Sequence, residues 1–326
     1  MTGHDWAIAV HGGAGARPRE MSATEEAGYR SGLAAALESG SSVLSAGGIA
    51  LEAVEAAIRV LEDDPRFNAG RGAVFSARGR NDLDAAIMDG SDLKAGSVAA
   101  VGHTRHPISL ARAVMEKSGH VMLCGDGAEA FAKRVGLEQV VPSFFYTEKR
   151  WQELIRELQR QCLPIPARPR GAHRSGETGH AGADTHRYGT VGAVARDRTG
   201  HIAAGTSTGG TTAKRWGRIG DSPIIGAGTY ASDQSCAVSA TGTGEYFIRL
   251  TAAREIGALV QYCRMPLQAA VDEVVQHRLT ALGGDGGVIA VGALGEVAWS
   301  FNTDLMFRAK AAEEHDPVIA IFKEDR

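Results

Sequence analysis

Hydroxyl groups gather in three short glycine-containing stretches in the second half of the chain. Thr190 begins the apolar run "TVGAVARD" directly after Gly189, Thr208 lies in "TSTGG", and Thr241 precedes Gly242 in "ATGTGE". A threonine hydroxyl acts as a nucleophile only when a base lies beside it. A free N-terminal amine on the same residue can be that base, because its pKa of about 8 is near physiological pH.

Two interpretations of Thr190 are open on the local sequence. A β-branched residue after a glycine can simply begin a strand. Alternatively, Thr190 is a nucleophile that is exposed when the chain is cut in front of it. Residues 164–188 contain three prolines, four glycines and few large apolar side chains, so they cannot bury enough surface to order themselves. An abrupt end of this segment is what a cut in front of Thr190 would require, but the local sequence alone leaves both interpretations open.

The other polar stretches also have two readings each. "TSTGG" is either a polar turn or the nucleophile elbow of a hydrolase, with Ser207 as the nucleophile. A nucleophile elbow needs a helix directly after the serine, and the glycines and proline that follow disfavour one. Arg218 and Asp221 in "GRIGDSP" form a surface ion pair or recognise an amino acid, whose carboxylate suits a guanidinium and whose ammonium suits a carboxylate. Thr241 and Gly242 form an N-cap loop or an oxyanion site.

Composition limits the remaining possibilities. The 326 residues are 44% hydrophobic and 22% charged, as in a globular protein, and the net charge of −3 argues against nucleic acid as a partner. We expect no membrane span, because no apolar run is long enough, and no signal peptide, so a cytoplasmic protein with reduced thiols is expected. The histidines within 164–188 lack the spacing of metal ligands, so we expect no metal site there. The glycines of "HGGAG" do not have the spacing of a phosphate-binding loop.

The order of the expected elements indicates an α+β protein. After a first strand that enters a loop at "HGGAG", helices are expected over 22–46 and 49–62, strands at 81–90 and 95–103, and helices over 107–119, 126–135 and 147–161. A hairpin follows at 190–197 and 201–208, then a strand at 235–242, helices near 243–258 and 266–281, and a closing hairpin at 286–292 and 296–302. Strand-rich blocks between paired helices predict sheets covered by helical layers.

Nine motifs in register resemble the plant-type asparaginase and isoaspartyl peptidase family of N-terminal-nucleophile hydrolases. They cover nearly the whole chain: "HGGAG", "FNAGRGAVF", "LDAAIMDG", "KAGSVAAV", "GTVGAVA", "TSTGG", "GRIGDSPIIGAGTYA", "TGTGEYFIR" and "FNT". The resemblance implies a single domain over 1–326, folded as a four-layer αββα sandwich. It also implies self-cleavage into an α subunit (1–189), with a mobile tail at 164–189, and a β subunit (190–326).

The resemblance further assigns roles to individual residues. It implies hydrolysis of β-aspartyl dipeptides and L-asparagine, with Thr190 as the nucleophile and Thr208 hydrogen-bonded to it. Asn68 is implied to lie beside the nucleophile. Arg218 and Asp221 are implied to bind the aspartyl α-groups, with Thr241 and Gly242 as the oxyanion hole.

The same resemblance implies a structural sodium ion but no cofactor for the chemistry, and a dimer of αβ units. The ion would be held by backbone carbonyls, which suit a hard cation, of Leu61, Glu62, Asp64, Phe67, Ala69 and Arg71.

Two alternatives remain beside this reading. Several motifs also resemble glycosylasparaginases, although that branch typically has aspartate where this chain has Gly189. A catalytically dead amino-acid-binding protein on the same scaffold is the alternative from another class. The bulky Trp216 close to Arg218 leaves the side-chain preference open.

Overall fold

The computed structural model describes residues 6–16, 21–172 and 189–325. Within these ranges, the helices are α1 (Ala23–Ser45), α2 (Ala50–Asp63), α3 (Pro107–Lys117), α4 (Gly125–Arg134), α5 (Glu148–Arg160), α6 (Gly244–Leu250), α7 (Ala252–Cys263) and α8 (Leu267–Asp272). Three shorter helical segments are η1 (Gly70–Gly72), η2 (Pro142–Phe144) and the π-helical η3 (Glu273–Leu279), which continues α8.

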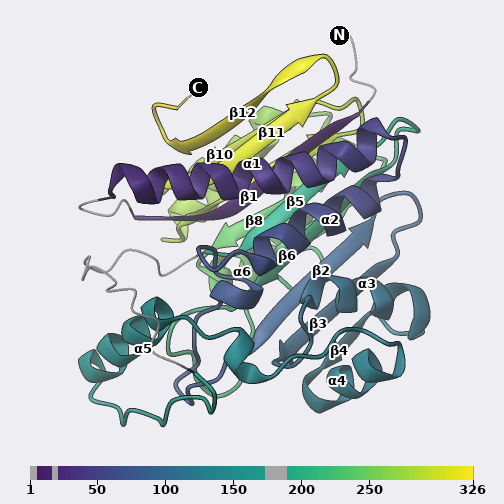
Figure 1. Cartoon of the computed structure of the whole chain (residues 1–326). Helices are drawn as coiled ribbons and strands as arrows, with labels where there is room; N and C mark the ends of the chain where they lie inside the picture. Colours follow the sequence, from purple (N-terminus) through teal and green to yellow (C-terminus); the bar gives the residue numbers. More distant parts are fainter. Residues whose placement is uncertain (1–5, 17–20, 173–188, 326) are drawn as a thin grey trace.

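The strands form two sheets (Figure 1). The larger has the order β12-β11-β1-β5-β6-β2-β3-β4 and the smaller the order β10-β9-β8-β7. Their bounds are β1 (Ala7–Gly15), β2 (Leu83–Asp89), β3 (Ala95–Val101), β4 (Met122–Cys124), β5 (Val191–Arg196), β6 (Ile202–Thr208), β7 (Thr229–Ala231), β8 (Cys236–Gly242), β9 (Gly286–Gly292), β10 (Val297–Phe301), β11 (Leu305–Ala312) and β12 (His315–Phe322).

Three apolar clusters pack the two sheets against each other and against the helices. The largest packs α1, α2 and α3 on one face of the larger sheet, where Figure 1 shows α1 and α2 crossing in front of β1, β5 and β6. A second cluster, with Ala9, Val194, Ala204, Ala237 and Ile289, lies between the two sheets. The third packs α6, α7, α8 and η3 on the other face of the smaller sheet. This is a mixed α+β protein with two sheets and helices, as predicted.

Local signals explain why the main helices lie where the sequence predicted them. Ser22 caps α1 by accepting a hydrogen bond from the N–H of Glu25, whose carboxylate bonds back to Ser22. Pro107 occupies the first turn of α3, where its missing N–H costs nothing. In α2, the apolar residues face the larger sheet, and the charged residues except the buried Glu62 lie on the more exposed side.

Three expectations about the elements are wrong, and two short strands were missed. β1 does not enter a loop at "HGGAG" but continues to Gly15 across a bulge between His11 and Gly13. The 286–301 hairpin does not close the chain, because β11 and β12 follow it. The helix expected over 243–258 breaks at Thr251, which has a left-handed φ of 48°, and the short strands β4 and β7 were not foreseen.

Part of the segment expected as a mobile tail lies within the described ranges. Residues 164–172 form no helix or strand there, yet the Arg168 guanidinium donates to Glu148 at 2.8 Å and to the Tyr146 hydroxyl at 2.7 Å. Residues 173–188, which make up most of that expected tail, lie outside the described residues. No helix in the described ranges is long and apolar enough to cross a membrane.

Candidate active site

Thr190 lies at the start of β5, hydrogen-bonded to the end of β6. Its hydroxyl donates to the Thr208 hydroxyl across 2.9 Å, and the N–H of Gly210 donates to the same Thr208 oxygen across 3.0 Å. Both threonines are nearly completely buried, at 8% and 2% exposed. The bond follows from strand pairing, because Val191 lies opposite Ser207 and Gly192 opposite Thr206 in the antiparallel ladder. The predicted Thr190–Thr208 contact is thus present.

Thr241 faces the same space from the smaller sheet. The hydroxyls of Thr206 and Ser239 lie 2.7 Å apart and connect β6 to β8. The apolar residues of both strands, Ala204 and Ala237, belong to the cluster between the sheets, so the polar ends of the two strands lie at one end of it. Thr241 follows Ser239 by two residues and therefore points from the same face of its strand, as Thr208 does two residues after Thr206.

A buried histidine from the "HGGAG" stretch of β1 contacts Ser239, one of the hydroxyl residues that connect the two sheets. His11 Nε2 lies 2.9 Å from the Ser239 hydroxyl, and burial lowers the His11 pKa to about 3, so the imidazole is neutral. Gly192 is required beside it, because a Cβ there would lie 2.0 Å from the Ser239 oxygen. Neither His11 nor Ser239 was identified from sequence, where "HGGAG" was weighed only as a loop.

Asn68 binds the residue before Thr190 and the two residues after Thr208. Its backbone N–H donates to the carbonyl of Gly189 across 3.2 Å, and its carbonyl accepts from the Gly209 N–H across 3.0 Å. Its side-chain amide donates to the Gly210 carbonyl at 2.8 Å and accepts from the Val74 N–H at 2.9 Å. These four hydrogen bonds of a buried residue fix "FNAG" against "TSTGG".

Arg218 and Asp221 lie together, but they are not an ion pair. The Arg218 guanidinium instead binds Glu245 through two hydrogen bonds, of 2.9 and 3.1 Å. Gly244 explains their proximity, because a Cβ there would lie 2.7 Å from Asp221 Oδ1 and 2.9 Å from Arg218 Nη2. Glu245 was missed from sequence, although the motif "TGTGE" contains it. The reading of Arg218 and Asp221 as a simple surface pair is therefore wrong.

Asp221 Oδ2 and the Thr241 hydroxyl oxygen are among the polar atoms that are buried without a hydrogen-bond partner in the described part of the chain, as are His11 Nδ1 and Asp84 Oδ2. Burial raises the pKa of Asp221 to about 7, a shift that the nearby Arg218 only partly offsets. Buried polar groups are nearly always satisfied, so two orphaned ones in the same region indicate a place for ligand atoms.

In the loop from α2 to η1, two glycines lie directly against backbone carbonyls. A Cβ on Gly70 would lie 2.2 Å from the Glu62 carbonyl oxygen, and one on Gly72 would lie 2.0 Å from that of Phe67. The carbonyls of Asp64 and Ala69 each accept one backbone N–H, which leaves a second lone pair free. The oxygen-rich loop therefore fits a hard cation, and Leu61 and Arg71 lie at its two ends.

Trp216 does not cover Arg218 in this structure. Its side chain is 87% exposed and lies under the Arg215 guanidinium, 4.3 Å from the ring centre. Trp216 lines the rim of a cavity of about 360 Å³ to which Lys214 and Arg218 also contribute. This cavity opens beside the Arg218 side chain and adds room next to the site.

Comparison with known proteins places this geometry in a family. The family model described as asparaginase matches residues 4–321. The chain therefore belongs to the asparaginase family and is a hydrolase of that type.

Individual relatives match over nearly their full length. An isoaspartyl peptidase of Salmonella typhimurium is 48% identical over 318 residues, which cover 97% of this chain and 98% of that protein. A probable isoaspartyl peptidase/L-asparaginase 2 of Arabidopsis thaliana is 42% identical, with 98% and 99% covered. An isoaspartyl peptidase/L-asparaginase of Mus musculus is 41% identical, with 89% and 82% covered.

Proposed function

We propose that this protein hydrolyses β-aspartyl dipeptides and L-asparagine with Thr190 as its nucleophile. The observation that carries the proposal is the unpartnered, buried Oδ2 of Asp221 close to the Arg218 guanidinium. A carboxylate oxygen that has lost water and gained no donor favours a cationic ligand group. An aspartyl residue offers an ammonium for Asp221 and a carboxylate for Arg218 on one carbon atom.

Self-cleavage comes first in this proposal. The Thr190 hydroxyl oxygen attacks the Gly189 carbonyl carbon, and the bond from that carbon to the Thr190 nitrogen breaks, which leaves an ester and a free amine. Water then hydrolyses the ester and releases residues 1–189 with a new carboxylate. The Asn68 N–H, which already donates to the Gly189 carbonyl, supports this step because it faces the oxygen on which negative charge develops.

Turnover then uses the liberated amine of Thr190 as the base. The amine accepts the hydroxyl proton as the oxygen attacks the substrate's side-chain carbonyl, and it returns a proton to the departing amine. Thr241 and Gly242 hold the oxyanion, a role supported by the unpartnered Thr241 hydroxyl. Water next cleaves the aspartyl ester, which gives aspartate and restores the threonine.

The finer architecture follows the same proposal. Three apolar interfaces support a four-layer αββα sandwich of the N-terminal-nucleophile type, one domain over 1–326. A sodium ion on the carbonyls of Leu61, Glu62, Asp64, Phe67, Ala69 and Arg71 would order the loop that carries Asn68. We also propose a dimer of αβ units in the cytoplasm, with no cofactor for the chemistry.

A substrate panel tests the proposed activity. Purified protein is incubated with a β-aspartyl dipeptide, the matching α-aspartyl dipeptide, L-asparagine and N-glycosylated asparagine, and free aspartate is measured. Release from the β-aspartyl dipeptide and asparagine, but not from the α-linked isomer, is expected. Preferential release from the glycosylated substrate would indicate a glycosylasparaginase, and binding without release would indicate an amino-acid-binding protein.

A further inference from the structure

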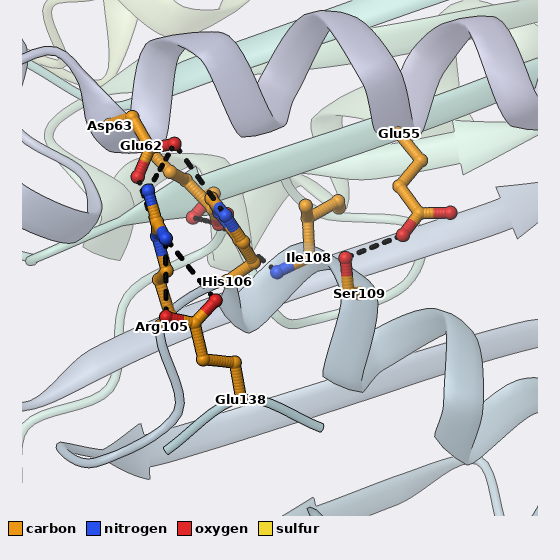
Figure 2. A network of polar contacts seen from close by, with 9 residues as sticks. Glu55, Glu62, Asp63, Arg105, His106, Ile108, Ser109 and Glu138 are labelled. Atoms are coloured by element: carbon orange, nitrogen blue, oxygen red, sulfur yellow. Dashed lines mark hydrogen bonds and ion pairs between the residues drawn. The ribbon is translucent and has the colours of Figure 1, made fainter. Parts of the chain in front are cut away.

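A buried carboxylate outside the substrate site connects to it through the back of β6. Glu62 is the penultimate residue of α2, and its side chain is completely buried. Its Oε1 accepts hydrogen bonds from the Ser207 hydroxyl at 2.6 Å and the Ile108 N–H at 3.0 Å, while His106 Nδ1 lies 3.2 Å from Oε2 (Figure 2). One carboxylate therefore joins α2, the start of α3 and β6.

The three contacts explain how a carboxylate can be buried here. Pro107 opens α3 and has no N–H, so the Ile108 N–H belongs to the first turn, where a negative charge is favoured by the helix dipole. Ser207 supplies a second donor, and the tautomer of His106 that carries a proton on Nδ1 supplies a third. Replacing the carboxylate by an amide turns one of its two acceptor oxygens into a donor, which then faces another donor, and this is costly in a buried place.

Ser207 transmits this constraint to the nucleophile's partner. Side chains alternate along a strand, so Ser207 points toward the helices while Thr208, the next residue, points between the sheets. Thr208 accepts the hydrogen bond from the Thr190 hydroxyl. The hydrogen bond from Ser207 to Glu62 thus fixes the position of β6 at Thr208, the residue that binds Thr190.

The backbone of Glu62 begins the loop that carries Asn68. Gly70 packs against the Glu62 carbonyl so closely that any Cβ there would lie 2.2 Å from its oxygen. Asn68, between them in sequence, bonds to Gly189, Gly209 and Gly210. Glu62 therefore holds both partners of the reacting centre, with its side chain on β6 and its main chain on the loop.

We propose that Glu62 is a positioning residue, whose side-chain carboxylate keeps Thr208 and Asn68 in register around Thr190. The inference rests on the proposed function only for its kinetic readout, because its structural readout is independent of activity. Glu62 touches neither Thr190 nor Arg218 and Asp221 through any hydrogen bond of the described structure. Its loss should therefore affect the rate of chemistry and leave substrate affinity largely unchanged.

A second glutamate on the same helix provides a matched control. Glu55 lies two turns earlier on α2 and also bridges to α3, where it binds the Ser109 hydroxyl (Figure 2). It also binds the Arg112 guanidinium at 2.8 Å. Within the described residues it makes no hydrogen bond to β6. Glu55→Gln thus changes the same chemical group between the same two helices without disturbing the strand.

The experiment compares Glu62→Gln and Glu55→Gln with the parent protein, each as mature enzyme. We expect Glu62→Gln to lower kcat for a β-aspartyl dipeptide by about tenfold to a hundredfold, as small misplacements do, with KM within about threefold. Glu55→Gln should leave kcat and KM unchanged. Backbone hydrogen exchange at Gly209 and Gly210 should accelerate in Glu62→Gln alone, because their acceptors on Asn68 and Thr208 shift.

Equal losses of kcat in the two variants, or unchanged exchange and kcat in Glu62→Gln, would overturn the proposal. If Glu62→Gln does not fold, Ser207→Ala removes only the hydroxyl that reaches Glu62 and should reproduce both effects; parent-like exchange in that variant also overturns it. A parent protein without activity counts against the proposed function alone, since the exchange comparison still tests Glu62.

Discussion

The backbone N–H of Asn68 donates a hydrogen bond to the carbonyl oxygen of Gly189, 3.2 Å away, at the bond that precedes Thr190. The backbone carbonyl of Asn68 accepts from the N–H of Gly209, so the bond that we propose is cut and the end of β6 beside it share one anchor. The uncut chain thus presents its Gly189 carbonyl to a fixed donor, within the site that the cut chain would use for substrates.

This contact predicts that Gly189 matters for maturation and not for turnover. A Cβ on Gly189 would lie 2.8 Å from the Asn68 Cβ, closer than real side chains approach. Gly189→Ala should slow self-cleavage, measured as loss of the full-length band with time. Once cut, the variant should match the parent kcat, because residue 189 has left the nucleophile. Gly127→Ala, where a Cβ meets nothing within 4 Å, should cleave at the parent rate; equal rates for Gly189→Ala would refute the role.

Arg218 should affect substrate binding while leaving maturation intact. The scissile Gly189–Thr190 bond carries no free α-carboxylate, so Arg218→Ala should still cleave itself. Loss of a charge-assisted substrate contact should cost about 2–5 kcal/mol, or at least about thirtyfold in kcat/KM, mainly through KM. Arg249→Ala alters an exposed arginine of the same region, on α6, and should leave KM unchanged. A parent-like KM in Arg218→Ala would remove this residue from the site.

Substrate affinity should improve as the pH rises through about 7. Burial raises the pKa of Asp221 to about 7, and only the ionised carboxylate pairs with a substrate ammonium. kcat/KM for a β-aspartyl dipeptide should therefore rise with pH and inflect near 7. Asp221→Asn should lose this inflection and bind substrate weakly, while any inflection in kcat from the Thr190 amine remains. A pH profile unchanged by Asp221→Asn would contradict this assignment.

The same shift has an opposite consequence for folding stability. Because the Asp221 pKa lies above its value of 3.8 in an unfolded chain, the folded state binds more protons between these values. The contribution of Asp221 to the free energy of unfolding is thus fully present below about pH 3.8 and is lost as pH rises toward 7. Thermal unfolding should show a shallower decline over this range in Asp221→Asn than in the parent protein.

Sodium should act on structure rather than on chemistry. The carbonyls around Gly70 and Gly72 would lose their shared cation if sodium were replaced by choline at constant ionic strength, and the loop that holds Asn68 would loosen. The melting temperature, the activity or both should then fall, and restoring sodium should recover them. An identical melting curve and full activity in choline would show that this loop holds no ion.

Elements with strong local signals were predictable, but contacts between distant residues were not. The capped helix α1 and the hairpin of β5 and β6 match their predicted ranges within a few residues, because caps, periodicity and the "RTG" turn are local. β11 and β12 were missed. β12 contains Pro317 and three exposed residues at its start, as an edge strand tolerates, so its alternation is weak.

The site shows the same division. "TSTGG" and "GTVGAVA" suggested Thr190 and Thr208 as partners, and strand pairing brings them within 2.9 Å. The Ser207–Glu62 bond spans 145 positions, and nothing local in either stretch points to it. Glu245 likewise lies within the motif "TGTGE", yet only the fold shows that it binds the Arg218 guanidinium.

The most direct test of the whole account is whether the chain is cut before Thr190. Purified parent protein, 34.2 kDa in full, should separate on a denaturing gel into bands of about 20 and about 14 kDa, in proportion to residues 1–189 and 190–326. The smaller should begin TVGAVA by N-terminal sequencing. Thr190→Ala should remain one inactive full-length band, while Thr190→Ser, which keeps the hydroxyl, should still cleave. An intact parent chain that hydrolyses β-aspartyl dipeptides would contradict the account, because an uncut Thr190 has an amide where the mechanism needs a basic amine.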